Sequence, residues 1–351
     1  MRRLTMLALL TAVTVTVLHA AETSIRYAPG NGPGKGRHVV FLAGDEEYRS
    51  EEALPMLAKI LSQRHGFTST VLFSLDDDGT INPKNTRSLS DPEALDTADA
   101  IVMMLRFRNW PDETMARFDQ RIRAGVPIIA IRTSTHAFNG LSKGSPWDSW
   151  NYNNQGGFGK RVLGETWLTH WGRHKAEATR GVIEPSQRDH PVLSGVDSVF
   201  GDTDVYEAYP PDDATILMRG LVLQGMTPDS PPAEYRKRRA TDKQEQGVND
   251  PPMPVVWTRL HTHDGGATSR ILTITMGSAT DFENEGLRRL VVNGVYWGLG
   301  MDVPKQANVA YVDDYDPSFY GFDGFRKGLR VTDFALGSNV PGEPLRRPAP
   351  K

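Results

Sequence analysis

Cysteine is absent from the 351-residue chain. Its absence excludes disulfide bonds, thiolate ligands for metals and any cysteine nucleophile. A strong excess of charge of either sign is also missing, because the formal net charge is -3 at pH 7. The composition therefore gives no reason to expect nucleic acid or an anionic membrane surface as a partner.

A glycine-rich nucleotide loop is missing as well. The first predicted strand is followed by Gly44-Asp-Glu-Glu, which lacks the G-x-G-x-x-G pattern that binds a dinucleotide pyrophosphate. We therefore do not expect NAD chemistry.

A long apolar run occurs at the N-terminus, where Arg2 and Arg3 precede apolar residues that end at the small residues Ala20 and Ala21. This order is typical of a secretory signal peptide, and the run is too short for a stable membrane span. We expect residues 1–21 to be removed and the mature protein to be periplasmic or secreted, with no membrane span. An uncleaved signal anchor is the alternative.

The remaining sequence divides into three parts. Residues 22–36 are rich in proline and glycine, and we expect a linker without regular structure. Residues 37–303 contain the periodic apolar segments of an α/β domain. Residues 304–351 form a C-terminal extension without such segments, which we expect to wrap over the domain and to fray at its end.

Three short apolar runs predict strands that are buried on both faces: His38–Ala43, Ala100–Leu105 and Ile128–Ile131. Apolar residues at helical spacing follow the first two of them. Repeated units of this kind favour a doubly wound, mainly parallel sheet with right-handed crossovers. Ligands bind such sheets beyond the carboxyl ends of the strands, so we expect the site there.

Polar and charged residues follow all three strands at that edge. They are Asp45, Glu46 and Arg49 after the first strand, Arg106 and Arg108 after the second, and Arg132, Thr133, Ser134 and His136 after the third. Guanidinium groups suit carboxylates, phosphates and sugar hydroxyls, so we predict that this set binds a substrate. Alternatively, the acidic residues neutralise the arginines in a purely structural network.

The turn after the third strand could contain a nucleophile, Ser134, and a base, His136, close to the amides of a helix N-terminus. The glycines that flank a nucleophile elbow are missing, and capping of a helix by the hydroxyl groups is the competing interpretation. Among the functional interpretations, we favour ligand binding by Arg132 and acid/base catalysis by His136, with Glu46 as its partner.

Two histidines, His170 and His174, follow Trp167, whose ring could stack on a sugar. At this spacing on a helix, two imidazoles and a carboxylate such as Glu165 could bind zinc, although Gly172 argues against a helix. Three uses of the histidines therefore stay open, namely hydrogen bonds to a sugar, packing within a loop, and a metal. We expect no cofactor, and zinc is the weakest of the three.

Two long segments have no periodic pattern. Residues 139–159 are rich in glycine, asparagine, serine and tryptophan, and the segment is too long for an idle connection, so we predict a lid or binding loop. Residues 227–252 are charged and rich in proline, and we expect them to be exposed and mobile.

Four segments of the domain are distinctive as a set. They are Gly44-Asp-Glu-Glu-Tyr-Arg-Ser-Glu-Glu, Arg132-Thr-Ser-Thr-His-Ala-Phe, Gly164-Glu-Thr-Trp with His170 and His174, and Met276-Gly-Ser-Ala-Thr-Asp-Phe with the helix Gly286–Gly300. Together they resemble the ThuA-like (trehalose utilisation) family over roughly residues 37–303. The resemblance implies a class I glutamine amidotransferase-like α/β fold, related to flavodoxin, and a role in carbohydrate utilisation.

Two departures limit what the resemblance carries over. The amidotransferase relatives have a cysteine nucleophile in the turn where this chain has Thr133 and Ser134, so glutamine amidotransfer through a thioester is excluded. ThuA-like proteins commonly have histidine where this chain has Arg132, and another in the late turn where it has Gly277-Ser278. A histidine site at those two positions is therefore not carried over.

We predict an exported protein that binds or processes a sugar or an oxidised sugar, by general acid/base hydrolysis or elimination without a cofactor. A non-catalytic sugar-binding module on a degenerate amidotransferase-like fold is one alternative, since a fold alone does not define a function. A metal-dependent hydrolase is the other. The expected partner is a small carbohydrate, and the sequence identifies no protein partner.

Overall fold

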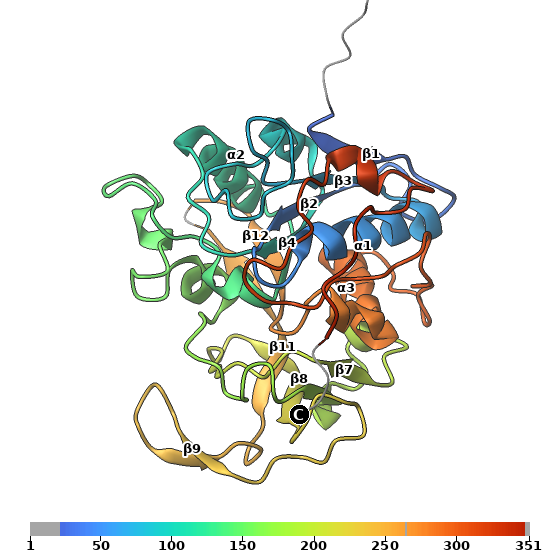
Figure 1. The fold of residues 1–351 in the computed structure, drawn as a ribbon. Coiled ribbons are helices and arrows are strands. Elements are labelled where there is room, and N and C mark those ends of the chain that lie inside the picture. Colours follow the sequence, from blue (N-terminus) through green and yellow to red (C-terminus); the bar gives the residue numbers. More distant parts are fainter. Residues whose placement is uncertain (1–21, 264, 348–351) are drawn as a thin grey trace, which may run out of the picture.

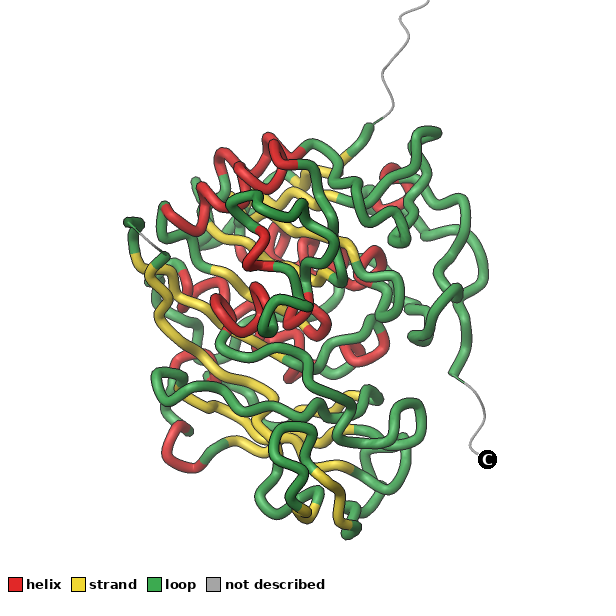
Figure 2. The backbone as a smooth tube through the Cα atoms, turned by 90° about the vertical axis from the view of Figure 1, so that its left-hand side faces the viewer, coloured by secondary structure: helices red, strands yellow, loops and turns green. Residues whose placement is uncertain are grey.

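The computed structural model describes residues 22–263 and 265–347, which include a sheet of ten strands. The strands lie in the order β1-β3-β2-β4-β5-β12-β11-β8-β6-β7, and Figures 1 and 2 show the sheet running through the whole molecule. The strands are β1 (Ser24–Tyr27), β2 (His38–Gly44), β3 (Thr68–Leu72), β4 (Ala100–Leu105), β5 (Ile128–Ile131), β6 (Thr179–Ile183), β7 (Val199–Gly201), β8 (Thr215–Val222), β11 (Met253–Thr262) and β12 (Thr268–Ile274). The α-helices are α1 (Ser50–His65), α2 (Asp112–Arg123) and α3 (Glu285–Gly298).

The parallel part of the sheet confirms the predicted fold class. Strands β3, β2, β4, β5 and β12 pair in parallel, and three of them lie where the apolar runs predict strands. The sheet then continues with β11, β8, β6 and β7, which pair with one another in antiparallel fashion, and β11 pairs antiparallel with β12. The result is a mixed sheet, and the carboxyl ends of the parallel strands form one edge of its doubly wound half.

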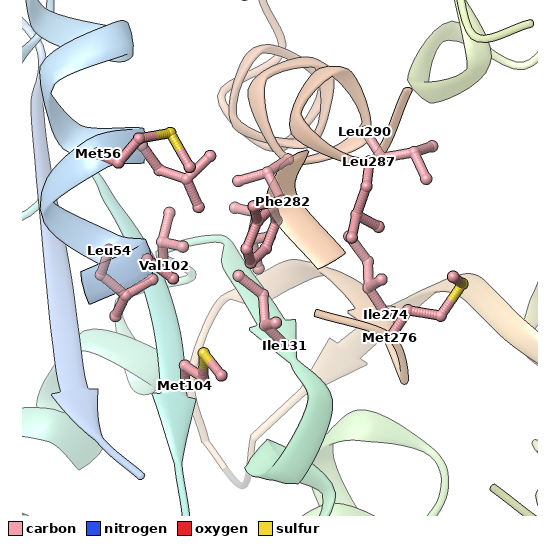
Figure 3. Close-up of a cluster of buried hydrophobic side chains, with 14 of the residues drawn as sticks. Leu54, Met56, Val102, Met104, Ile131, Ile274, Met276, Phe282, Leu287 and Leu290 are labelled. Carbon is pink, nitrogen blue, oxygen red and sulfur yellow. The ribbon is translucent and has the colours of Figure 1, made fainter. Parts of the chain in front are cut away.

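Both faces of the parallel strands are buried, because alternate residues point to opposite sides of a strand. Helices α1 and α3 cover one face, where Val102 and Met104 of β4 belong to the same buried cluster as Leu54 of α1 and Leu290 of α3 (Figure 3). On the other face, the alternate residues of β4 pack with the apolar residues of α2, such as Phe118. This two-sided packing explains why the strands are continuous apolar runs.

The expectation that residues 22–36 contain no regular element is wrong. Residues Ser24–Tyr27 form β1, which pairs antiparallel with β3 at the edge of the sheet. The Tyr27 side chain is buried, and its hydroxyl donates to the Phe334 carbonyl at 2.7 Å. A strand of only four residues that pairs with one neighbouring strand has too short an apolar pattern to be predicted from the sequence.

The expected lid, residues 139–159, is packed against the core. Trp147, Trp150 and Phe158 are buried and join the cluster that surrounds Phe118 and Phe138. Burial of three large aromatic side chains is a strong reason for a loop to stay in place, because each contributes a large apolar area. The interpretation as a lid is therefore not supported.

The exposed excursion at residues 227–252 contains a hairpin of β9 (Arg236–Arg238) and β10 (Glu245–Gly247), which pair antiparallel apart from the main sheet. Figure 1 shows β9 projecting from the lower end of the molecule. The predicted exposure of β9 is confirmed, but the segment has more regular structure than the sequence indicates.

The C-terminal extension wraps over the domain, as expected. Figure 1 shows this red segment passing from beside β1 across the front of the molecule. It contains the short helix η8 (Val331–Phe334), and Lys59 of α1 donates to Asp313 in the extension at 2.6 Å. The predicted signal peptide and the predicted fraying of the C-terminal end fall on residues outside the described part of the chain. Among the described residues, the helices are too short or too polar to cross a membrane.

Candidate functional site

Segments that are far apart in the sequence meet at the carboxyl edge of the parallel strands, as predicted. Glu46, after β2, accepts from Arg108, after β4, at 3.1 Å. Asp45, also after β2, accepts a hydrogen bond from the Thr133 hydroxyl after β5. The His174 imidazole reaches the same edge, with its Nε2 atom 3.2 Å from a Glu47 oxygen. The structure therefore brings all four predicted segments, 45–49, 106–108, 132–136 and 165–174, into one site.

The backbone is strained at three positions of this site. Arg49, Phe107 and Arg132 have φ angles of 63°, 50° and 47°, in the left-handed region that non-glycine residues rarely adopt. Such strain tends to cluster at functional sites, where the surrounding structure holds it in place. Arg132 directly follows β5 and begins the short helix η2 (Arg132–His136). An arginine therefore occupies the sharp strand-to-helix turn that carries the nucleophile in enzymes with a nucleophile elbow.

A buried ion pair between Arg132 and Asp204 forms the centre of the site. Both side chains are fully buried, and the Arg132 guanidinium lies 3.0 Å from Asp204 Oδ1. The same guanidinium donates to the Thr275 carbonyl at 2.7 Å and lies 3.7 Å from the centre of the Tyr206 ring. Arg132 has no exposed surface left for a ligand, so its predicted role in direct substrate binding is replaced by a role in holding Asp204.

Asp204 in turn orients two imidazoles. Its Oδ2 atom lies 2.8 Å from His170 Nδ1, and its Oδ1 atom lies 3.1 Å from His174 Nδ1. The second ring nitrogen of His174 faces Glu47. The two rings lie 4.5 Å apart between their centres, and their side chains are 32% and 26% exposed. They are the titratable groups of this cluster that a ligand can reach.

The carboxylates favour the charged form of His174. Burial opposes protonation, but the hydrogen bonds to Asp204 and Glu47 outweigh it and raise the pKa of His174 above 6.5. Burial also opposes ionisation of Asp204, yet the hydrogen bonds from the two imidazoles and the charge of Arg132 hold its pKa below 3.8. Asp204 is therefore ionised at neutral pH, and its carboxylate and that of Glu47 favour the protonated form of His174.

His136, the predicted acid/base residue, is in the wrong environment for that role. Its side chain is buried, and its ring packs 5.0 Å from Phe107 and 5.3 Å from Trp167, measured between ring centres. Burial, together with the charges of Arg106 and Arg132, lowers the pKa of His136 well below 6.5. A neutral imidazole under an aromatic cover is a packing element of the site rather than its proton carrier.

The hydroxyl groups of the turn are structural, which corrects the prediction of a serine nucleophile. Ser134 Oγ donates to the Met103 carbonyl at 3.0 Å and accepts from the Leu105 amide at 3.2 Å, so it links β4 to η2. Thr133 donates to Asp45, which is fully buried and accepts from the amides of the following turn. Burial and the charge of Glu46 raise the pKa of Asp45 to about 6. None of the three predicted groups, Asp45, Thr133 and Ser134, is accessible to a ligand.

The remaining predicted cations also belong mainly to a structural network, the alternative that the sequence left open. Arg49 and Arg108 are fully buried, and Arg49 donates to the carbonyls of Glu46 and Gly321. Arg106 is partly exposed and pairs with Glu46, which itself is held by both Arg106 and Arg108. Arg106 is therefore the one predicted arginine that keeps a surface for a ligand.

Aromatic side chains surround the exposed imidazoles. Trp167 lies 5.5 Å from His170 and 6.3 Å from Tyr152, between ring centres, and both aromatic residues are only half-buried. The buried indole Nε1 atom of Trp167 has no hydrogen-bond partner among the described residues. Aromatic faces beside polar groups are a surface on which the apolar face of a sugar ring can lie. The predicted role of Trp167 in substrate binding agrees with this position.

Sequence reasoning missed Asp204 and gave no role to Tyr48 and Tyr206, whose rings contact the Arg132 guanidinium. These residues have weak signals in the sequence. Asp204 and Tyr206 follow β7, a strand of three residues that has no recognisable period. The one available signal is an acidic residue and a tyrosine close together in an otherwise non-periodic segment.

The site also fits a metal in part. His170, His174 and Asp204 each offer one ligand atom, and these atoms lie within 4.8 Å of one another. Two imidazoles and a carboxylate are a common zinc set. However, the charge of Arg132 lies 3.0 Å from the Asp204 carboxylate, which disfavours a second cation at the same oxygen. As Gly172 indicates, the histidines do not lie on a helix, since His170 forms an isolated β-bridge with Tyr206 and His174 lies in a turn.

Comparisons with known proteins give a match to a family model and several similar solved structures. The model of the ThuA family, described as trehalose utilisation, matches residues 37–298. No curated protein matches the chain. One similar solved structure is a ThuA-like protein from Parabacteroides merdae ATCC 43184, with 14% identity, a TM-score of 0.48 and coverage of 77% of this chain and 92% of that chain. Another is a ThuA-like protein from Bacteroides uniformis ATCC 8492, with 14% identity, a TM-score of 0.45 and coverage of 79% of this chain and 96% of that chain.

A third solved structure is the glutaminase domain of Trypanosoma brucei CTPS with bound acivicin. It has 11% identity and a TM-score of 0.36, with coverage of 78% of this chain and 98% of that domain.

Proposed function

Because the chain belongs to the ThuA (trehalose utilisation) family, we propose that it binds a sugar or an oxidised sugar at the His170–His174 pair and processes it by general acid/base chemistry. The observation that supports this proposal is the shared carboxylate of Asp204, which orients two partly exposed imidazoles side by side. The predicted signal peptide supports export to the periplasm or the medium as part of the same proposal.

The two imidazoles suit complementary roles. His174 is held between two carboxylates and favours the protonated form, so it is the general acid that donates a proton to a leaving oxygen. His170 bonds to Asp204 through Nδ1, and its Nε2 atom has no hydrogen-bond partner among the described residues. Through this Nε2 atom His170 acts as the general base, towards a water or an acidic hydrogen beside the carbonyl of an oxidised sugar. Asp204 fixes the orientation of both rings, as carboxylates do in other histidine sites.

Turnover assays with disaccharides, trehalose among them, and with their keto derivatives test this proposal. We expect His170→Gln and His174→Gln each to reduce kcat by about 100-fold or more, the range for loss of a general acid or base. His190→Gln is the matched control, because His190 lies on a turn where it accepts from the Val192 amide outside the site. Full activity of both site variants would refute the assignment of the imidazoles.

A non-catalytic sugar-binding module is the alternative on the same surface. Binding of a sugar to the wild type without turnover of any substrate in the panel favours this module. The exposed aromatic and imidazole groups then act only in recognition, and the same two variants lose affinity instead of rate.

Metal-dependent hydrolysis is the second candidate, and the grouping of His170, His174 and Asp204 favours it. Elemental analysis of the purified protein separates it from the first. One equivalent of zinc or another transition metal, lost in His170→Gln, would replace the acid/base proposal. Activity that survives removal of metal by a chelator supports the acid/base proposal.

A further inference from the structure

The C-terminal extension contacts the site although it lies beyond residue 298, where the match to the family ends. The Tyr320 ring stacks on Tyr48 with ring centres 5.2 Å apart and lies 5.5 Å from the His174 ring. The next residue, Gly321, donates its amide to the Glu47 carbonyl at 2.8 Å. Two consecutive residues of the extension therefore touch the groups that hold the imidazole pair.

The third residue, Phe322, faces a cation of the site. The Arg106 guanidinium lies 4.9 Å from the Phe322 ring centre and 4.6 Å from that of Phe107, so each ring contacts it. Phe322 is 53% exposed, and it is the one aromatic among the strongly exposed large hydrophobic side chains of the described chain. Phe322 therefore presents apolar surface that a ligand can contact.

The extension is firmly held where it passes the site. The Ser318 amide donates to Glu52 at 2.7 Å, the Phe319 amide donates to the Leu345 carbonyl at 2.7 Å, and the Tyr320 hydroxyl donates to the Asp202 carbonyl at 3.0 Å. These bonds tie the extension to α1, to its own end and to the segment after β7. Phe322 therefore projects from a fixed support.

The position of Phe322 relative to the imidazoles indicates what it contacts. One oxygen of Glu47 lies 3.2 Å from His174, and its other oxygen lies 3.9 Å from Arg106. Arg106 and Phe322 are therefore separated from the imidazole pair by a single carboxylate group. A ligand with two linked rings can place one ring at the imidazoles and the other beside the guanidinium and the phenyl ring, which suit hydroxyl groups and an apolar sugar face respectively.

We infer that Phe322, supplied by the C-terminal extension, forms with Arg106 a second subsite that binds the far ring of a disaccharide. This inference rests on the proposed function of the imidazole pair as a sugar site. It adds that the extension determines the preference for two rings over one.

Calorimetric titration of the full chain with trehalose and with D-glucose tests the inference. We expect Phe322→Ala to weaken trehalose binding by about tenfold, which corresponds to one stacking contact, and to leave glucose binding within about twofold. Leu336→Ala is the matched control, because Leu336 is an exposed hydrophobic residue of the same extension that is 44% exposed. A melting curve of each variant establishes that it is folded.

The possible results separate the two proposals. Unchanged trehalose affinity in Phe322→Ala, or an equal loss for both sugars, would overturn the second subsite and leave the imidazole site intact. Absence of binding of either sugar to the wild type would overturn the proposed sugar site and, with it, the subsite.

Discussion

Replacement of Asp204 by asparagine tests the centre of the site most directly. The Asp204→Asn variant keeps the shape of the side chain but removes the charge that pairs with Arg132, and both groups are fully buried. Removal of one partner from a buried ion pair leaves the other charge uncompensated and costs about 3–5 kcal/mol of unfolding free energy. His174 also loses a partner that favours its charged form, so its pKa decreases.

Urea denaturation at pH 7 and an NMR titration of the histidine ring protons measure these two effects. Asp213→Asn is the matched control, because Asp213 pairs with Arg259 at 2.7 Å but is 55% exposed. An exposed pair contributes no more than about 1 kcal/mol. If Asp204→Asn were as stable as this control and the pKa of His174 did not move, the account of a charged, buried centre would be wrong.

Three further predictions concern neighbouring features. The stability that His174 contributes is fully present below its unfolded pKa, near 6.5, and is lost as the pH rises through its raised folded pKa. The difference in unfolding free energy between wild type and His174→Gln, measured by urea denaturation, should therefore be larger at pH 5.5 than at pH 9. Ser134→Ala should lose about 1–3 kcal/mol of unfolding free energy, because it leaves the Leu105 amide without its partner, while sugar turnover persists; abolished turnover in a stable variant would restore the serine as a nucleophile. Trp150→Ala should lose about 3–5 kcal/mol in the same assay, because Trp150 is buried in the core, whereas a true lid residue would change activity with little effect on stability.

The sequence predicts the parallel half of the fold well, because strands buried on both faces leave continuous apolar runs. The run Ile128–Ile131 coincides with β5, and Ala100–Leu105 coincides with β4. The sequence fails where structure depends on a single neighbour or on non-periodic packing. The four residues of β1 have one partner strand, and the aromatic residues of the segment 139–159 reach the core without a regular spacing.

The site shows a similar division. The position of each loop at the carboxyl edge follows from the order of the strands, so the meeting of Glu46, Arg108 and His174 at one edge was predictable. The role of each side chain was not, because the sequence does not say whether a hydroxyl such as that of Ser134 faces a ligand or bonds a neighbouring strand. Arg132 was assigned to a ligand for the same reason, since its partner Asp204 lies in a segment without a recognisable pattern.

The contact between the extension and the first loop also affects when the protein becomes complete during its synthesis. Arg49 and Gly321, which bond to each other, are separated by 272 residues, and contacts between such distant positions form late and slowly. A ribosome releases the β2 loop long before it has made Tyr320. Strands β2, β3, β4 and β5 can therefore pair before the Tyr320 ring beside His174 is available.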